Sequence, residues 1–151
     1  ACNGIGRWAG WAPCCSLRSA VCGVESRGFL FGAAVAVELG VGFVPIRKEH
    51  GLFPGPKLTR DASFPDYRGA RHRLRIQRRS VTAADHVLLV DDWIETGSQA
   101  RTVKAMVEAC GGSWAGCSVI VDQADALGDD VRQALGVRGI VHASELPPHP
   151  N

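Results

Sequence analysis

One stretch in the second half of the sequence constrains the fold more than any other. Residues 86–90 (HVLLV) form a short apolar run, which is typical of a strand buried on both faces of a parallel sheet. Two acids, Asp91 and Asp92, follow it, and a helix is predicted over residues 98–109, ended by Gly111 and Gly112. A buried strand that passes through a polar turn into a helix indicates an α/β sheet.

The same alternation occurs near the start of the chain. Residues 19–24 are predicted to form a short buried strand, and residues 29–39 (FLFGAAVAVEL) a largely buried helix ended by Gly40. Residues 42–46 are predicted to form a second strand. Two strands joined by a helix almost always pair in parallel through a right-handed crossover.

The pattern continues to the end of the chain. Residues 115–121 favour a strand, residues 125–135 a helix, and residues 137–141 a last strand. Strands and helices that alternate in this way predict a doubly wound, mostly parallel α/β sheet of the Rossmann-like class.

The length of 151 residues fits a single domain. We assign this domain to residues 18–143. Residues 1–17 show neither helical nor strand periodicity and are left unassigned, whereas prolines recur in residues 144–151, which we expect to form an extended tail.

Residues 49–70 interrupt the alternation. Glycine and proline recur in them, which favours turns over a packed helix. A loop of about 20 residues in a compact domain is usually functional and often a lid. Residues 73–78 then return as a basic strand with Leu74 and Ile76 on one face. We therefore predict a hairpin that leaves the sheet and comes back, and that acts as a mobile lid.

Positive charge is concentrated in the same region. Residues 68–79 hold six arginines and no acid, whereas the net charge of the whole chain is only +2. Two interpretations stand. The run is a solvated or interface strand, which we favour, or it forms a face that binds phosphate or nucleic acid.

Composition and motif spacing narrow the class of protein further. No apolar run approaches the roughly 20 residues of a membrane span, and the N-terminus lacks a signal pattern. Six cysteines occur, four of them within the first 22 residues, but none in CxxC or CxxH spacing, so no structural zinc site is expected. We predict a cytoplasmic protein with reduced thiols.

The turn after the central strand carries the chemistry. Ligands of open α/β sheets bind beyond the carboxyl ends of the strands, where Asp91 and Asp92 lie. Adjacent carboxylates suit a polyhydroxyl ligand or a metal-bound one. Residues 95–98 lead into a helix N-terminus, which attracts an anion such as phosphate, and Gly97 lets the backbone approach closely. This pattern suits ribose 5-phosphate; the alternative is that the acids are solvated and Ser98 only caps the helix.

Three segments resemble a known family. The string VLLVDDWIETGSQA (87–100) is similar to the phosphoribosyl pyrophosphate (PRPP) signature of type I phosphoribosyltransferases. Residues 23–48 (GVESRGFLFGAAVAVELGVGFVPIRK) resemble the corresponding stretch of adenine phosphoribosyltransferases, and residues 54–64 (PGPKLTRDASF) resemble their mobile-loop region. The similarity extends over roughly residues 19–123.

The resemblance implies an enzyme of the glycosyltransferase (pentosyltransferase) class in purine salvage. Such an enzyme moves ribose 5-phosphate from PRPP to a nucleobase, a purine such as adenine, and releases pyrophosphate. Mg²⁺ accompanies PRPP, held mostly by the ligand and water, and a homodimer is expected, without membrane or nucleic-acid partners. The resemblance implies that pyrophosphate is bound by Glu25, Ser26 and Arg27, in a turn where a cis peptide is common, and by Arg47 and Lys48. It implies that Asp91 and Asp92 bind the ribose hydroxyls. The 5-phosphate would be bound by Thr96, Gly97, Ser98 and Gln99.

Departures from the family pattern leave alternatives open. Residues 1–17 do not resemble the N-terminal part that covers the base in the family, so a non-purine acceptor is a rival interpretation, as is a PRPP- or nucleotide-binding regulator with little catalysis. Glu95 takes the place of an acid proposed as general base in hypoxanthine–guanine enzymes. It is predicted either to act as that base or, as we favour, to be a helix-start acid.

Overall fold

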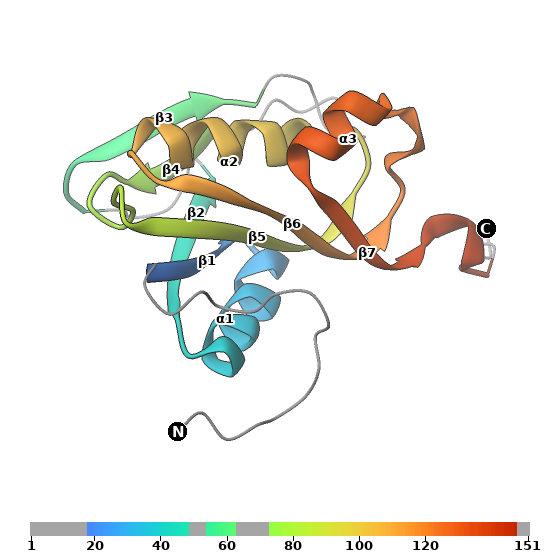
Figure 1. The fold of residues 1–151 in the computed structure, drawn as a ribbon, viewed down its shortest axis with the longest axis horizontal. Coiled ribbons are helices and arrows are strands. Elements are labelled where there is room, and N and C mark those ends of the chain that lie inside the picture. Colours follow the sequence, from blue (N-terminus) through green and yellow to red (C-terminus); the bar gives the residue numbers. More distant parts are fainter. Residues whose placement is uncertain (1–17, 49–53, 63–72, 148–151) are drawn as a thin grey trace.

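Seven strands form one sheet in the order β3-β4-β2-β1-β5-β6-β7, with α1 on one face and α2 and α3 on the other (Figure 1). The computed structural model describes residues 18–48, 54–62 and 73–147. The elements in chain order are β1 (Arg18–Val24), α1 (Arg27–Leu39), β2 (Gly42–Lys48), β3 (Lys57–Asp61), β4 (Arg73–Gln77), β5 (Asp85–Ile94), α2 (Ser98–Ala109), β6 (Ser113–Asp122), the 3-10 turn η1 (Ala124–Ala126), α3 (Asp129–Leu135), β7 (Val137–His142) and the 3-10 turn η2 (Ala143–Glu145).

The five central and C-terminal strands are parallel. β1 pairs with β2 and β5, and β6 pairs with β5 and β7, all in parallel. Helices connect β1 to β2, β5 to β6 and β6 to β7, which is how parallel neighbours are joined. The predicted doubly wound, mostly parallel α/β sheet is therefore confirmed, and the carboxyl ends of these strands share one edge.

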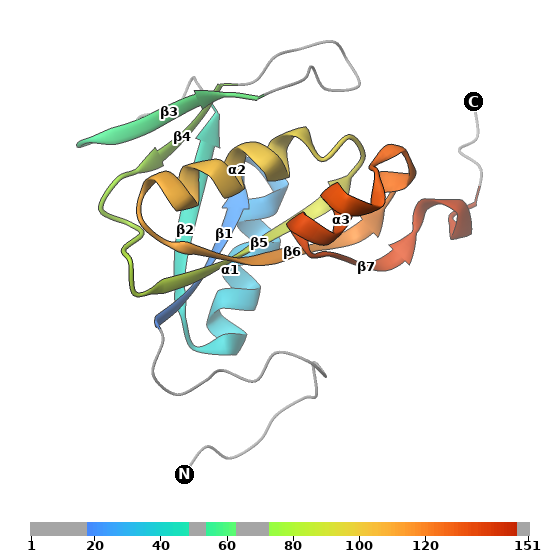
Figure 2. The same cartoon turned by 45° about the horizontal axis from the view of Figure 1, so that its top comes forward.

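The antiparallel hairpin β3–β4 extends the sheet beyond β2 (Figure 2). Its β4 strand joins β2 through two register pairs, Arg47 with Arg75 and Lys48 with Leu74. Leu74 and Ile76 are fully buried, as the alternation in residues 73–78 predicted. The hairpin is confirmed, while residues 49–53 and 63–72, which also belong to the predicted lid, lie outside the described residues.

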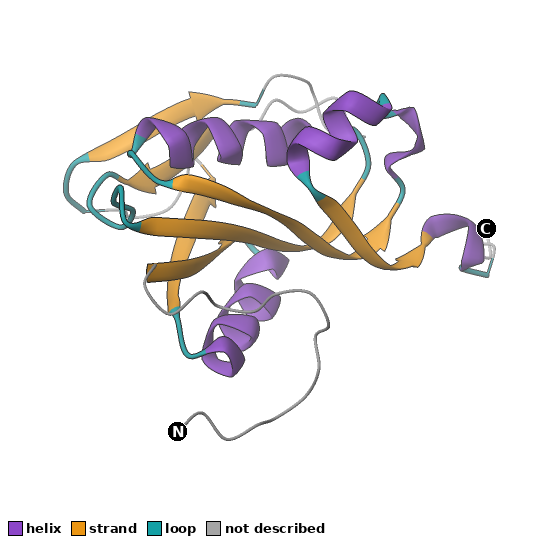
Figure 3. Cartoon of the chain, in the orientation of Figure 1, coloured by secondary structure: helices purple, strands orange, loops and turns teal. Residues whose placement is uncertain are grey.

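Apolar side chains from both faces of the sheet form the core. On one face Val87 and Leu89 of β5 belong to the same buried cluster as Val103 and Met106 of α2. On the other face a smaller cluster includes Val90, beneath α1. Figure 3 shows the helices stacked on the two faces of the strands. This two-sided burial explains why residues 86–90 are almost continuously apolar.

Two elements differ from their predicted form. Helix α1 is not largely buried, since Leu30 is 72% exposed and Val37 82% exposed. Its sheet-facing side instead uses small residues, and a Cβ on Gly32 would lie 2.7 Å from the ring of Phe43, so the backbone packs directly on the sheet. Strand β5 runs on to Ile94 rather than ending at Val90, so the two acids lie within the strand.

The C-terminal part also differs from its prediction. Helix α3 covers Asp129–Leu135 rather than residues 125–135, because Gly128, with extended backbone, separates it from the turn η1. The carboxylate of Asp122 on β6 accepts hydrogen bonds from the Arg132 guanidinium, which holds the pKa of Asp122 below its usual value and ties α3 to the sheet. The expected extended tail begins with the turn η2, and residues 148–151 lie outside the described part.

Two broader expectations concern the thiols and the membrane. Cys22, Cys110 and Cys117 of the described residues are free thiols, and burial raises the pKa of Cys117 to about 12. Within the described ranges, no helix is long and apolar enough to cross a membrane.

Candidate functional site

The predicted site residues gather at the carboxyl ends of three neighbouring strands. The turn after β1, the end of β2 and the end of β5 lie at one edge, because β1 pairs in parallel with both β2 and β5. Residues from the first and second halves of the sequence therefore meet where α/β sheets bind ligands.

Glu25 connects the turn after β1 to the end of β2. The peptide bond between Glu25 and Ser26 is cis, as the family resemblance implied. The Glu25 carboxylate accepts hydrogen bonds from the backbone N–H of Lys48 at 2.9 Å and from Nη2 of Arg47 at 3.2 Å. The Arg47 guanidinium holds the pKa of Glu25 below its usual value. Glu25 thus holds the Arg47 guanidinium and the main chain at the end of β2 beside the turn.

The start of α1 packs against the turn with almost no side-chain volume between them. A Cβ on Gly23 would lie 2.1 Å from the carbonyl oxygen of Gly28, so only glycine fits at this position. A Cβ on Gly28 would lie 2.9 Å from Oδ1 of Asp91. Glycine therefore lets the N-terminus of α1 approach the acidic pair on β5.

The two acids differ in environment. Asp92 forms an ion pair with Arg27, with 2.9 Å between Oδ2 and Nε. Asp91 accepts the backbone N–H of Asp92 at 3.0 Å. Burial raises the pKa of Asp91 to about 7. The backbone N–H of Asp92 partly offsets the rise, and the adjacent Asp92 carboxylate adds to it. Near neutral pH the pair therefore offers both acceptor and donor oxygens, a combination suited to hydroxyl groups.

The loop between β5 and α2 depends on a left-handed glycine. Gly97 has φ 65° and precedes the first residue of α2, with no side-chain capping bond. Ser98 is buried, and its backbone N–H lies 3.4 Å from Oγ1 of Thr96. Ser98 is thus the first helical residue and not the cap, so its alternative interpretation as a simple helix cap is wrong. Glu95 and Thr96 are exposed, and Gln99 is half-buried.

Trp93 is a feature of this edge that the sequence interpretation missed. Its side chain is 42% exposed, and its Nε1–H donates to Oε1 of Gln123, just after β6, at 2.9 Å. An aromatic ring therefore stands in a fixed orientation one residue after Asp92. The signal was present in the sequence, because tryptophan is an unusual choice between two acids and a phosphate-type loop.

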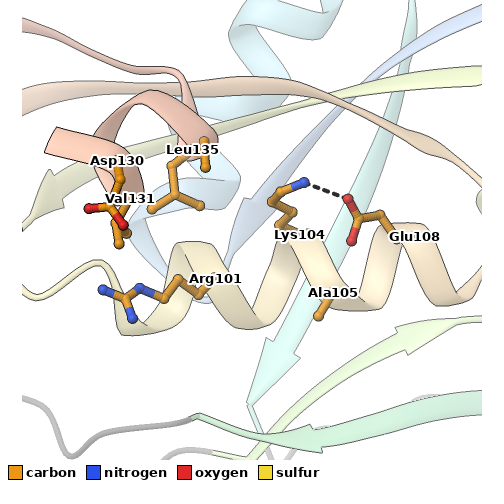
Figure 4. A pocket seen from close by; sticks show the side chains of 8 residues that line it. Arg101, Lys104, Ala105, Glu108, Asp130, Val131 and Leu135 are labelled. Atoms are coloured by element: carbon orange, nitrogen blue, oxygen red, sulfur yellow. Dashed lines mark hydrogen bonds and ion pairs between the residues drawn. The ribbon is translucent and has the colours of Figure 1, made fainter. Parts of the chain in front are cut away.

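A hollow of about 350 Å³ lies between α2 and α3 (Figure 4). Its walls include Arg101, Val131 and Leu135, together with the ion pair between Lys104 and Glu108. None of the predicted site residues is among the eight that line it.

Comparisons with known proteins relate the whole arrangement to one family. Residues 17–147 match the model of the phosphoribosyl transferase domain. An adenine phosphoribosyltransferase of Methylobacillus flagellatus is 42% identical over 118 residues, which cover 78% of this chain and 65% of that protein. The chain therefore spans slightly less than two thirds of the length of this relative.

Solved structures give the same relation at the level of the fold. The adenine phosphoribosyltransferase of Thermoanaerobacter pseudethanolicus superposes with a TM-score of 0.71 at 29% identity, covering 83% of this chain and 70% of that one. The enzyme of Giardia lamblia, in complex with 9-deazaadenine, gives a TM-score of 0.68 at 29% identity, with the same coverage of 83% and 70%.

Proposed function

The chain belongs to the phosphoribosyltransferase family, and from that premise we propose that it transfers ribose 5-phosphate from PRPP to a purine, with adenine as the first candidate, and releases pyrophosphate. The relatives that share its sequence and fold are named adenine phosphoribosyltransferases. One observation carries the proposal most directly: the cis turn, the cations on β2 and the acids on β5 meet at one edge of the sheet. Such an enzyme would belong to purine salvage in the cytoplasm, with residues 18–143 as its catalytic domain.

The ribose 5-phosphate would lie between the acids and the loop that opens α2. Asp91 and Asp92 would hold the ribose hydroxyls. The backbone N–H groups of residues 96–99 and the hydroxyls of Thr96 and Ser98 would hold the 5-phosphate, since free N–H groups and the helix dipole favour an anion at a helix N-terminus. The left-handed Gly97 supports this role because it allows the loop to turn tightly there.

The leaving pyrophosphate would lie at the cis turn. Arg27, Arg47 and Lys48 provide positive charge around Glu25 and Ser26, and charge develops on the pyrophosphate as its bond to ribose breaks. Fixed cations at the place where negative charge forms lower the barrier, which is the usual contribution of electrostatic preorganisation. Positioning of the two substrates supplies the rest.

Mg²⁺ would enter with PRPP. In the described ranges no group of three or more His, Cys, Asp or Glu side chains could hold a metal ion. The ion would be bound by diphosphate oxygens and water, and the Asp91 and Asp92 carboxylates would lie close to it. The ion would neutralise charge on the departing pyrophosphate.

The acceptor base would lie against Trp93. Purines stack well on indole rings, and the bond from Trp93 to Gln123 holds this ring in place beside the ribose site. Glu95, exposed two residues further on, would be the candidate to remove a proton from the base.

A homodimer through the outer face of α1 completes the proposal. Leu30, Phe31, Val37 and Leu39 expose apolar surface on this helix, and the helix begins at the proposed pyrophosphate turn. A second copy of the chain would remove that surface from water.

An acceptor screen tests the activity. The protein is mixed with PRPP, Mg²⁺ and one candidate acceptor at a time, starting with adenine, hypoxanthine and guanine, and pyrophosphate release is recorded. We expect release with adenine. Release only with a non-purine acceptor would support the proposed reaction but identify a different acceptor. PRPP binding without pyrophosphate release with any acceptor would favour a regulator.

A further inference from the structure

Gln123 lies just beyond the carboxyl end of β6, directly beside the end of β5. Ile94 and Asp122 are the last register partners of these two parallel strands, and the backbone N–H of Gln123 donates to the carbonyl oxygen of Ile94 at 2.9 Å. The end of β5 carries the two acids and leads into the loop proposed for the 5-phosphate. The main chain therefore anchors Gln123 at the same edge of the sheet as the candidate site.

The hydrogen bond with Trp93 determines which end of the Gln123 amide is free. An indole N–H can only donate, so its partner at 2.9 Å is the amide oxygen, Oε1. The amide nitrogen, Nε2, is the other branch of the group, and its two N–H donors have no hydrogen-bond partner among the described residues. The Gln123 side chain is exposed, so a bound molecule can reach these donors.

A donor held in this way suits the edge of a flat heterocycle. The bond to Trp93 already restricts the Gln123 side chain, so a second hydrogen bond costs less entropy than one from a free side chain. The indole ring offers a face for stacking, and the amide beside the ring offers donors. Ring nitrogens of a purine are acceptors at the edge of the base. The pair of side chains thus matches a base that has both a flat face and an acceptor at its edge.

We propose that Gln123 is a specificity-determining residue, whose amide N–H donates a hydrogen bond to a ring nitrogen of the purine acceptor. This inference rests on the proposed function, because that function places the base on Trp93. Stacking alone selects weakly, since every base has a π face. A hydrogen-bond donor at a fixed position selects more strongly, because it discriminates against a base that carries C–H in place of the nitrogen.

Two substitutions at position 123 separate this contact from the support of Trp93. Gln123→Glu keeps an oxygen that can accept the indole N–H and replaces the free donors with an acceptor. Gln123→Met has a similar length and removes both hydrogen bonds. The substrates are adenine and its 1-deaza, 3-deaza and 7-deaza analogues, each with C–H in place of one ring nitrogen. For each, kcat/KM is measured with the full chain, PRPP and Mg²⁺.

The wild type should lose about 10- to 100-fold in kcat/KM with the analogue that lacks the contacted nitrogen. Gln123→Glu should lower kcat/KM for adenine by a similar factor, mainly through the KM for the base, and leave the KM for PRPP unchanged. With that analogue Gln123→Glu should show no further loss, because the effects of removing two groups that contact each other are not additive.

Gln133→Glu is the matched control, because it makes the same change in an exposed residue of α3. It should resemble the wild type with every base. Wild-type kcat/KM for adenine in Gln123→Glu, with a loss only in Gln123→Met, would leave Gln123 as a support for Trp93 and overturn the inference. Additive effects of Gln123→Glu with all three analogues would also overturn it. Failure of the proposed function would show differently, as a wild-type protein that releases no pyrophosphate with any base.

Discussion

Asp91 is a residue whose pKa the fold raises into the neutral range. Its pKa is raised to about 7, mainly by burial, whereas a carboxyl group in the unfolded chain titrates near pH 4. The protonated form is therefore favoured in the folded protein. Stability from this group is fully present below about pH 4 and is lost as the pH rises through 7.

Asp91→Asn should remove this part of the pH dependence. An amide cannot ionise, so the free energy of unfolding of the variant should decline less than that of the wild type between pH 5 and pH 8. Urea unfolding at several pH values measures both curves. Parallel curves for the two proteins would show that Asp91 is ionised in the folded state throughout this range.

A single substitution at Glu95 tests whether this residue transfers a proton. As a general base it would remove a proton from the acceptor, so Glu95→Gln should lower turnover about 10²- to 10⁴-fold and leave PRPP affinity nearly intact. The acidic limb of the pH–rate profile should disappear with it. Glu95 lies ahead of the first turn of α2, where a dipole effect is weak, so a variant with normal turnover would leave it without a catalytic role.

At the scale of the element, the loop that opens α2 depends on Gly97. Any side chain there must adopt φ 65°, and a Cβ would lie 3.0 Å from a methyl group of Leu127. Gly97→Val should therefore cost about 1–3 kcal/mol of stability and distort the loop, weakening PRPP at least 10-fold.

Gly40→Val provides the matched control for this prediction. Gly40 ends α1 with nearly the same φ, 66°, but a Cβ there would have nothing within 4 Å. A valine at position 40 would have the same backbone strain as one at position 97, but it would neither contact Leu127 nor lie next to α2. PRPP affinity should stay at the wild-type level in Gly40→Val, and equal affinities in both variants would contradict a phosphate-binding role for the loop.

Most helices and strands could be predicted from the sequence, because apolar residues recur at the period with which each element turns one face toward the core. The sequence underestimated β5, whose pairing with β6 continues through Asp91 and Trp93 although the apolar run ends at Val90. Backbone pairing needs no apolar side chain, so composition cannot mark the end of such a strand. It overestimated the burial of α1, because an apolar helix exposed on one side has the same composition as one buried all round.

The candidate site could be predicted where its residues are adjacent in the sequence. Contacts that depend on the pairing of two strands could not. Thr96 to Gln99 form one loop and were recognised together. The hydrogen bond from Arg75 to the carbonyl of Lys48 depends on the register between β2 and β4, which β3 separates in the sequence. No local pattern encodes that register, so only the three-dimensional arrangement identifies it.

At the scale of the whole molecule, the exposed face of α1 predicts association. Val37 is 82% exposed, so Val37→Asp should leave the fold of the single chain intact while adding a charge to the proposed dimer surface. Light scattering should give a dimer for the wild type and a monomer for the variant. Glu38→Gln, an exposed neighbour, should remain dimeric, and a monomeric wild type would exclude the α1 interface.

The hydrogen bond between Trp93 and Gln123 makes the fluorescence of Trp93 a reporter of what binds beside it. An indole that is partly exposed and held in one orientation emits at wavelengths set by what lies on its ring, so a stacked purine should quench Trp93. The other three tryptophans, Trp8, Trp11 and Trp114, supply background emission that both proteins share. The difference spectrum between the wild type and Trp93→Phe isolates the signal, so the affinity of any acceptor can be read by titration without waiting for turnover.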